Sequence, residues 1–146
     1  MKKEISILLV EDNEGDIILT LEALKEAKIY NEINVVRDGD AALQYLNKEG
    51  EYQDAETPDL ILLDINLPKM DGIEVLAKIK SNEGLMVIPV VMLTTSDSEK
   101  DIFQSYQSHA NCYITKPVNF ENFMEVIQTI KNFWINIVQL PKVKDV

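Results

Sequence analysis

Short apolar runs alternate along the chain with segments of helical periodicity. The runs cover residues 5–10, 33–37, 60–64, 88–94 and 112–115. Near-continuous apolarity over so few residues is typical of strands buried on both faces. In the intervening segments apolar residues recur every three to four positions, as on the packed face of a helix: residues 16–27, 39–49, 72–81, 98–108 and 119–137.

Five strands alternating with five helices predict an α/β fold. Strands joined by helical crossovers run parallel, and right-handed crossovers place helices on both faces of the sheet. We therefore expect a doubly wound five-stranded parallel sheet flanked by five helices. The polar stretch 47–59 lacks a clear period and is predicted to be a loop.

Length and charge narrow the class of protein. The 146 residues fit one domain covering 1–146, with no output domain, an extended last helix and a short tail. The net charge of −11 repels phosphate backbones and anionic membranes, so we expect no binding to nucleic acid or membrane. The sequence contains neither a signal peptide nor a stretch that could span a bilayer, which indicates a cytoplasmic protein.

Polar side chains follow four of the predicted strands where each strand ends. Glu11 and Asp12 follow the first strand, Asp64 the third, Thr94 ends the fourth, and Lys116 follows the fifth. Because parallel strands present their carboxyl ends at one edge of the sheet, these groups should form one cluster there. Asp64 alone could be a turn former, but four further groups in the same phase favour a functional site.

Three carboxylates close together repel one another unless a cation lies among them. Oxygen ligands at an open site suit Mg²⁺, which needs only one or two carboxylates in addition to water or phosphate oxygens. An ionised Asp64 could then act as a nucleophile and form an aspartyl phosphate. Lys116 and the hydroxyl of Thr94 are candidates to neutralise charge on the transferred phosphoryl group.

The same set of motifs resembles the receiver domain of two-component response regulators. The motifs are LLVEDN, DLILLDINLPKMDG, IPVVMLTTS and CYITKP, and the resemblance runs from about residue 5 to about residue 130. It implies the flavodoxin-like or CheY-like fold with strand order 2-1-3-4-5. It also implies a signalling phosphoacceptor in a histidine-to-aspartate phosphorelay, which is not an enzyme beyond assisting its own phosphotransfer and slow dephosphorylation.

The resemblance assigns a role to each matching residue. Asp64 is the phosphoacceptor and, with Asp12 and the backbone carbonyl of Asn66, a Mg²⁺ ligand, whereas Glu11 acts through water. Lys116 pairs with the acidic site and the phosphate. Two switch residues and one peptide bond complete the set: Thr94, Tyr113, and a cis Lys116–Pro117 bond.

The chain also departs from the common family pattern. Glu11 stands where many members carry aspartate, and Thr95 is bulkier than the residue usual after the switch hydroxyl. Thr95 is therefore expected to slow phosphoryl entry or water attack. The insertion at 47–60, the TTSDSEKDI run and the NFWINIVQLP segment resemble stand-alone regulators that partner bacterial and cyanobacterial phytochrome histidine kinases.

Three other functions are alternatives to the phosphoacceptor. A receiver-like interaction module that never uses phosphate would bind its partner equally well after Asp64→Asn. A metal-dependent phosphatase needs a second acid at the position of Asn66. A flavin-binding protein needs hydroxyls and glycines after the first strand, where this chain has EDNEGD.

The C-terminal segment is the remaining feature of the sequence that points to a function. The helical period extends to about residue 137, longer than a crossover helix requires, and its last part is apolar nearly all round. Exposed apolar surface of this kind marks an interface. We therefore expect a homodimer through the face of the fourth and fifth strands and helices, with Phe133, Trp134 and Ile137 in the contact.

Overall fold

A computed structural model describes residues 5–29, 32–117 and 119–141. It confirms the predicted α/β fold: a parallel five-stranded sheet has the order β2-β1-β3-β4-β5. The strands are β1 (Ser6–Val10), β2 (Glu32–Val36), β3 (Leu60–Leu63), β4 (Val90–Thr94) and β5 (Cys112–Thr115). The α-helices are α1 (Glu14–Glu26), α2 (Gly39–Leu46), α3 (Gly72–Lys80), α4 (Glu99–Gln107) and α5 (Phe120–Ile130).

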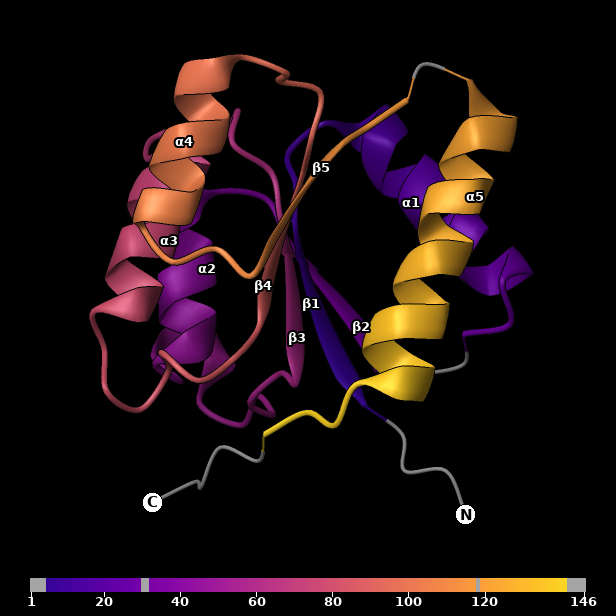
Figure 1. The fold of residues 1–146 in the computed structure, drawn as a ribbon. Helices are drawn as coiled ribbons and strands as arrows, with labels where there is room; N and C mark the ends of the chain where they lie inside the picture. Colours follow the sequence, from indigo (N-terminus) through magenta and orange to yellow (C-terminus); the bar gives the residue numbers. More distant parts are fainter. Residues whose placement is uncertain (1–4, 30–31, 118, 142–146) are drawn as a thin grey trace.

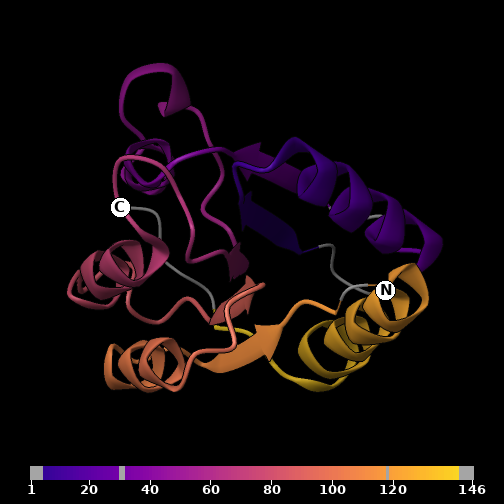
Figure 2. The ribbon, with the colours of Figure 1, turned by 90° about the horizontal axis from the view of Figure 1, so that it is seen from above.

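Two layers of helices cover the sheet. Helices α1 and α5 lie on one face, and α2, α3 and α4 lie on the other (Figures 1 and 2). The central strands are buried along their whole length, so alternate residues feed two separate cores. In β1, for example, Leu8 and Val10 join the core under α2 and α3, while Ile7 and Leu9 join the core under α1 and α5.

Side-chain caps fix where each α-helix begins. The caps accept a hydrogen bond from the backbone amide three residues later, which satisfies one of the unpaired donors of the first turn. They are Asn13, Asp38, Asp71, Ser98 and Asn119. In α1 the amide of Asp16 is the donor and the side chain of Asn13 is the acceptor, at 2.9 Å.

The insertion between α2 and β3 is packed onto the domain. It contains a short 3₁₀ helix, Gly50–Tyr52. The ring of Tyr52 lies 5.4 Å from that of Tyr45, measured between centroids, and packs against the core on the α2 side. The predicted loop is therefore held in place by an aromatic contact.

The C-terminal segment differs from the prediction of one continuous α-helix. Helix α5 ends at Ile130 and a π-helix follows, Lys131–Ile137, closed by a hydrogen bond from the amide of Val138 to the carbonyl of Phe133. Trp134 and Ile135 are partly buried against the core under α1 and α5. The expectation of an apolar surface exposed all round is therefore wrong for these two residues, which pack in part against that core. Phe133 is 49% exposed, and the side chain of Ile137 lies outside the described set.

Among the described residues, no helix is both long and apolar enough to cross a bilayer.

The turn after β3 depends on a glycine. A Cβ placed on Gly72 would lie 1.9 Å from the carbonyl oxygen of Asp64 and 2.7 Å from the Cα of Ile65. The amide of Gly72 also donates to the carbonyl of Ile65, at 2.8 Å. The start of α3 is therefore pressed directly against the backbone that carries Asp64.

We expect Gly72→Ala to lower the free energy of unfolding by about 3 kcal/mol, because backbone atoms cannot move aside as a flexible side chain can. Chemical denaturation at 25 °C measures the change. The matched control is Gly84→Ala, where a Cβ would meet only Asn82 Oδ1 at 3.4 Å. That control should stay within about 0.5 kcal/mol of the parent protein. Equal stability of the two variants would contradict the close approach at Gly72.

Candidate functional site

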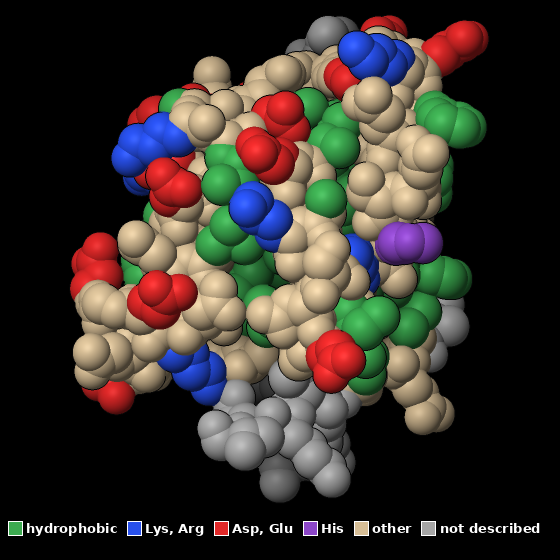
Figure 3. All heavy atoms as spheres, turned by 90° about the vertical axis from the view of Figure 1, so that its left-hand side faces the viewer, with side chains coloured by type: hydrophobic (Ala, Val, Ile, Leu, Met, Phe, Trp, Pro, Cys, Tyr) green, Lys and Arg blue, Asp and Glu red, His purple; other side chains and the backbone are tan. Residues whose placement is uncertain are grey.

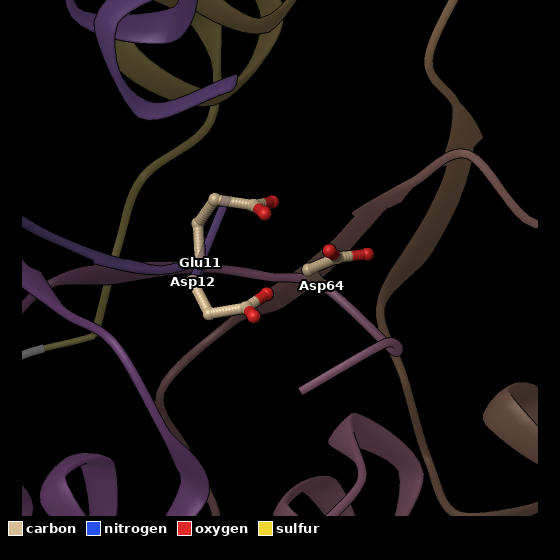
Figure 4. Close-up of side chains that lie close together, drawn as sticks. All are labelled: Glu11, Asp12 and Asp64. Carbon is tan, nitrogen blue, oxygen red and sulfur yellow. The ribbon is translucent and has the colours of Figure 1, made fainter. Parts of the chain in front are cut away.

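Three carboxylates lie together where β1 and β3 end. Main-chain hydrogen bonds extend the pairing past both strands: the amide of Asp64 donates to Val10, at 3.0 Å, and that of Glu11 to Val36, at 3.1 Å. The side chains of Glu11 and Asp64 are therefore carried on hydrogen-bonded backbone, and Asp12 follows Glu11 directly. Figure 4 shows them grouped at the carboxyl edge of the sheet.

The carboxylate cluster is close enough to share one cation. One carboxylate oxygen from each of the three residues lies within 4.8 Å of the others. Glu11 is 1% exposed and Asp64 6% exposed, whereas Asp12 is exposed to solvent. The cluster therefore has a buried floor and an open side, as an exchangeable hard cation with water ligands requires.

Lys116 is the buried cation of this site. Its ammonium lies 2.6 Å from Glu11 Oε2 and 3.3 Å from Asp16 Oδ2. Burial acts to lower the pKa of Lys116, but the hydrogen bond to Glu11 and the charges of Asp64, Glu11 and Asp16 outweigh it, so the pKa is raised. The ammonium is therefore fixed in its charged form beside the carboxylates.

The pKa of the Glu11 carboxyl group is shifted strongly upward. Burial raises its pKa from 4.5 to about 7, although the hydrogen bond and the charge of Lys116 act to lower it. The charge of Asp64 raises it further. Burial, more than the neighbouring carboxylates, therefore disfavours the charged form of Glu11, and a divalent cation beside it would favour that form.

Asp64 is held in a defined orientation. One of its oxygens, Oδ1, accepts a hydrogen bond from the amide of Ile65, at 2.8 Å. Asn66 follows in the loop and is exposed to solvent. A buried carboxylate so oriented has the properties of a nucleophile toward a group that enters from solvent.

A second polar group connects the end of β4 to β5 and α4. The hydroxyl of Thr94, fully buried, accepts a bond from the amide of Ser96, at 3.3 Å. The hydroxyl of Tyr113 donates to the carbonyl of Ser96, at 2.9 Å. Ser96 also donates through its own hydroxyl to Asp101, in the first turn of α4, at 2.6 Å. Thr94 and Tyr113 are thus linked through the loop after β4.

The predicted cis bond is wrong for this structure. No cis peptide bond occurs among the described residues, so Lys116–Pro117 is trans. The expectation came from the family resemblance alone, and the trans isomer is the one that X–Pro bonds generally prefer, by about 0.5–1 kcal/mol.

The structure brings together the strand-end residues and separates the C-terminal ones. Glu11, Asp12, Asp64 and Lys116 form one cluster. The π-helix that contains Phe133 lies at the other end of the molecule, because α5 runs back along the sheet from the carboxyl edge (Figure 1). Sequence reasoning missed the contact of Asp16 with Lys116 and the linking role of Ser96. Their spacing, four residues after Asp12 and two after Thr94, was the available signal.

Comparison with known proteins agrees with this geometry. The model of the response regulator receiver domain matches residues 7–128. The chain is 50% identical over 135 residues to the response regulator Rcp1 of Synechocystis sp., a match that covers 92% of each chain.

Two solved structures extend the likeness to three dimensions. The phosphorylated cyanobacterial phytochrome response regulator RcpA has a TM-score of 0.92 at 51% identity, covering 96% of this chain and 100% of that one. The Mn²⁺-bound form of Rcp1 has a TM-score of 0.89 at 49% identity, covering 94% and 99%. The resemblance to phytochrome response regulators is thereby confirmed, and the chain belongs to the response regulator receiver domain family.

Proposed function

We propose that this protein is a phosphorylation-controlled switch in which a histidine kinase or a phosphotransfer protein donates a phosphoryl group to Asp64. The observation that carries the proposal is the cluster itself. Asp64 is buried, and the amide of Ile65 orients its carboxylate. Glu11 and Asp12 each place a carboxylate oxygen within 4.8 Å of an oxygen of Asp64. The buried Lys116 forms an ion pair with Glu11.

The proposed metal is Mg²⁺. Asp12 and Asp64 would hold it directly, the backbone carbonyl of Asn66 would add a third ligand, and Glu11 would act through water. Bound there, the ion supplies positive charge beside the phosphoryl oxygens. The donor set fits a hard cation because every ligand is an oxygen, and the Mn²⁺-bound structure of Rcp1 gives a precedent in a relative.

In the proposed transfer, the protein orients the reacting groups and supplies positive charge beside the phosphoryl oxygens. A carboxylate oxygen of Asp64 attacks the phosphorus of a phosphohistidine, and an O–P bond forms as the N–P bond breaks. The electron pair of that bond stays on the imidazole, which takes a proton from water. Lys116 would neutralise one phosphoryl oxygen, and the hydroxyl of Thr94 would donate a hydrogen bond to another.

In the proposed switch, phosphorylation of Asp64 changes the conformation of the loop after β4. A Thr94 hydroxyl that turned to donate to the phosphoryl group would change the hydrogen bond that it accepts from the amide of Ser96. Ser96 is also the acceptor for Tyr113 and the donor to Asp101, so the same loop holds β5 and α4. Phosphorylation would shift the population between two arrangements of this loop, because the added contacts exist in only one of them.

The proposed kinase is of the phytochrome type, and the proposed setting is the cytoplasm. The support is the likeness to RcpA, a phytochrome response regulator, over nearly the whole of both chains. Phosphotransfer from a purified phytochrome histidine kinase to this chain, compared with transfer from an unrelated histidine kinase, would test the pairing.

The proposed output includes a homodimer through the face of β4, α4, β5 and α5. Exposed aromatic side chains occur on this side of the fold: Phe103 is 68% exposed and Tyr106 49% exposed, both on α4, and Phe133 follows α5. Figure 3 shows the side formed by α2, α3 and α4, where hydrophobic side chains reach the surface among charged groups. A second copy of this chain would bury such aromatics symmetrically.

Incubation with Mg²⁺ and acetyl phosphate should add one phosphoryl group per chain, detected by intact mass spectrometry. Asp64→Asn should abolish the gain, because the amide is not a nucleophile. Asp97→Asn, which removes an exposed carboxylate of the loop after β4, should retain it. If the parent protein gains no mass, a receiver-like module that acts without phosphate becomes the better explanation. Unchanged partner binding by Asp64→Asn would support that module.

Sedimentation velocity at high micromolar concentration tests the homodimer. We expect a dimer whose population rises when beryllium fluoride and Mg²⁺ are added, and Phe103→Ser should weaken it by about tenfold or more, as expected for an aromatic residue at the centre of an interface. A control is Ile18→Ser, which removes an exposed apolar side chain of α1 on the opposite face. A monomer both with and without the phosphoryl mimic would overturn the dimer.

A further inference from the structure

Lys116 has a second carboxylate partner that lies outside the predicted metal site. Asp16, in the first turn of α1, places Oδ2 3.3 Å from the ammonium of Lys116, one hundred residues away in sequence. Among the described residues, the hydrogen bonds of this ammonium run to Glu11 and Asp16, and none runs to Asp64. The lysine is therefore held on the α1 side of the cluster.

Asp16 is available for this contact because another residue caps the helix. Asn13 accepts the hydrogen bond from the amide of Asp16 and thereby satisfies the first turn of α1. The carboxylate of Asp16 is left to point toward Lys116. Its position near the N-terminus of α1 also suits a negatively charged side chain.

We infer that Asp16 is a positioning residue that holds Lys116 in its resting place and competes with phosphorylated Asp64 for the ammonium. The inference rests on the proposed phosphorylation. A phosphoryl group adds about −1.5 to −2 charges at pH 7 and strong acceptor oxygens. The ammonium has three donors, so it must share or exchange partners when these oxygens appear.

The two existing partners of Lys116 are not equally strong. The Glu11 pair is 2.6 Å long and its two side chains are 2% and 5% exposed, whereas Asp16 is 33% exposed and its pair is 3.3 Å long. The longer and more solvated ion pair is the weaker one. Asp16 is therefore the partner that Lys116 releases first, and its charge sets part of the cost of moving the lysine toward Asp64.

The first experiment uses the unphosphorylated protein and needs no phosphoryl transfer. The ¹⁵N NMR signal of the Lys116 ammonium, assigned by its loss in Lys116→Arg, reports the surroundings of the nitrogen. Asp16→Asn should move this signal, and Asp16→Glu should restore most of the original position. Glu22→Gln makes the same charge change at an exposed site of α1 and should leave the signal in place. An unmoved signal in Asp16→Asn would overturn the positioning role.

The second experiment measures the competition. Beryllium fluoride with Mg²⁺ mimics the phosphoryl group, and its dissociation constant can be measured by calorimetry. Asp16→Asn should bind the mimic about two- to fivefold more tightly, the range expected for removal of a partly exposed ion pair. Asp16→Glu and Glu22→Gln should match the parent protein.

The two experiments distinguish a failure of the positioning role from a failure of the competition. Unchanged or weaker binding in Asp16→Asn would overturn the competition, and so would equal tightening in Glu22→Gln, because that result would reflect net charge alone. If the parent protein binds no mimic, the proposed phosphorylation fails and the competition fails with it. The ammonium signal would still decide whether Asp16 positions Lys116.

Discussion

The structure depends on a buried ammonium placed over the end of the sheet. Lys116 follows β5, an edge strand, and Glu11 follows β1, which is three strand positions away in the order β2-β1-β3-β4-β5. Three spacings of a sheet amount to about 14 Å, so the two side chains meet only by reaching inward across the ends of β3 and β4. Asp64 and Thr94 stand at those two ends. The lysine therefore ties the edge strand to the centre and supplies the positive charge that the carboxylates need.

The cluster contains more buried carboxylate than its lysine can neutralise, and this imbalance determines how the site responds to added charge. Removing one member of a buried ion pair leaves an uncompensated charge, which costs about 3–5 kcal/mol in proteins generally. Here the pair is embedded among more carboxylates than one lysine can neutralise, and the pKa of Glu11 rises to about 7 as a result of its burial. A divalent cation at the cluster would offset part of the cost of burying these carboxylates in their charged form.

Much of the fold and of the site could be predicted from the sequence because both follow from short-range patterns. Apolar runs separated by helical periods determine a parallel sheet, and a parallel sheet gathers the residues after its strands, so Glu11, Asp12, Asp64 and Lys116 could be grouped before any coordinates. The missed features depend on where a particular turn points. The capping role of Asn13, the contact of Asp16 and the link through Ser96 are decided by single hydrogen bonds. The π-helix after Ile130 is decided by packing of Trp134 and Ile135 against the core, which periodicity does not reveal.

The hydrogen bonds around the site also indicate which part of the surface a change at Asp64 would reach. The π-helix that contains Phe133 follows α5 and lies at the end of the molecule opposite the carboxyl edge of the sheet (Figure 1). The start of α4 is different, because Asp101 is hydrogen-bonded to Ser96, and Ser96 is bonded in turn to Thr94 and Tyr113. Helices move as rigid units when their first turn is displaced, so a rearrangement of Ser96 would move Phe103 and Tyr106 along with Asp101. The start of α4 is therefore the part of the surface that is most directly connected to the end of β4.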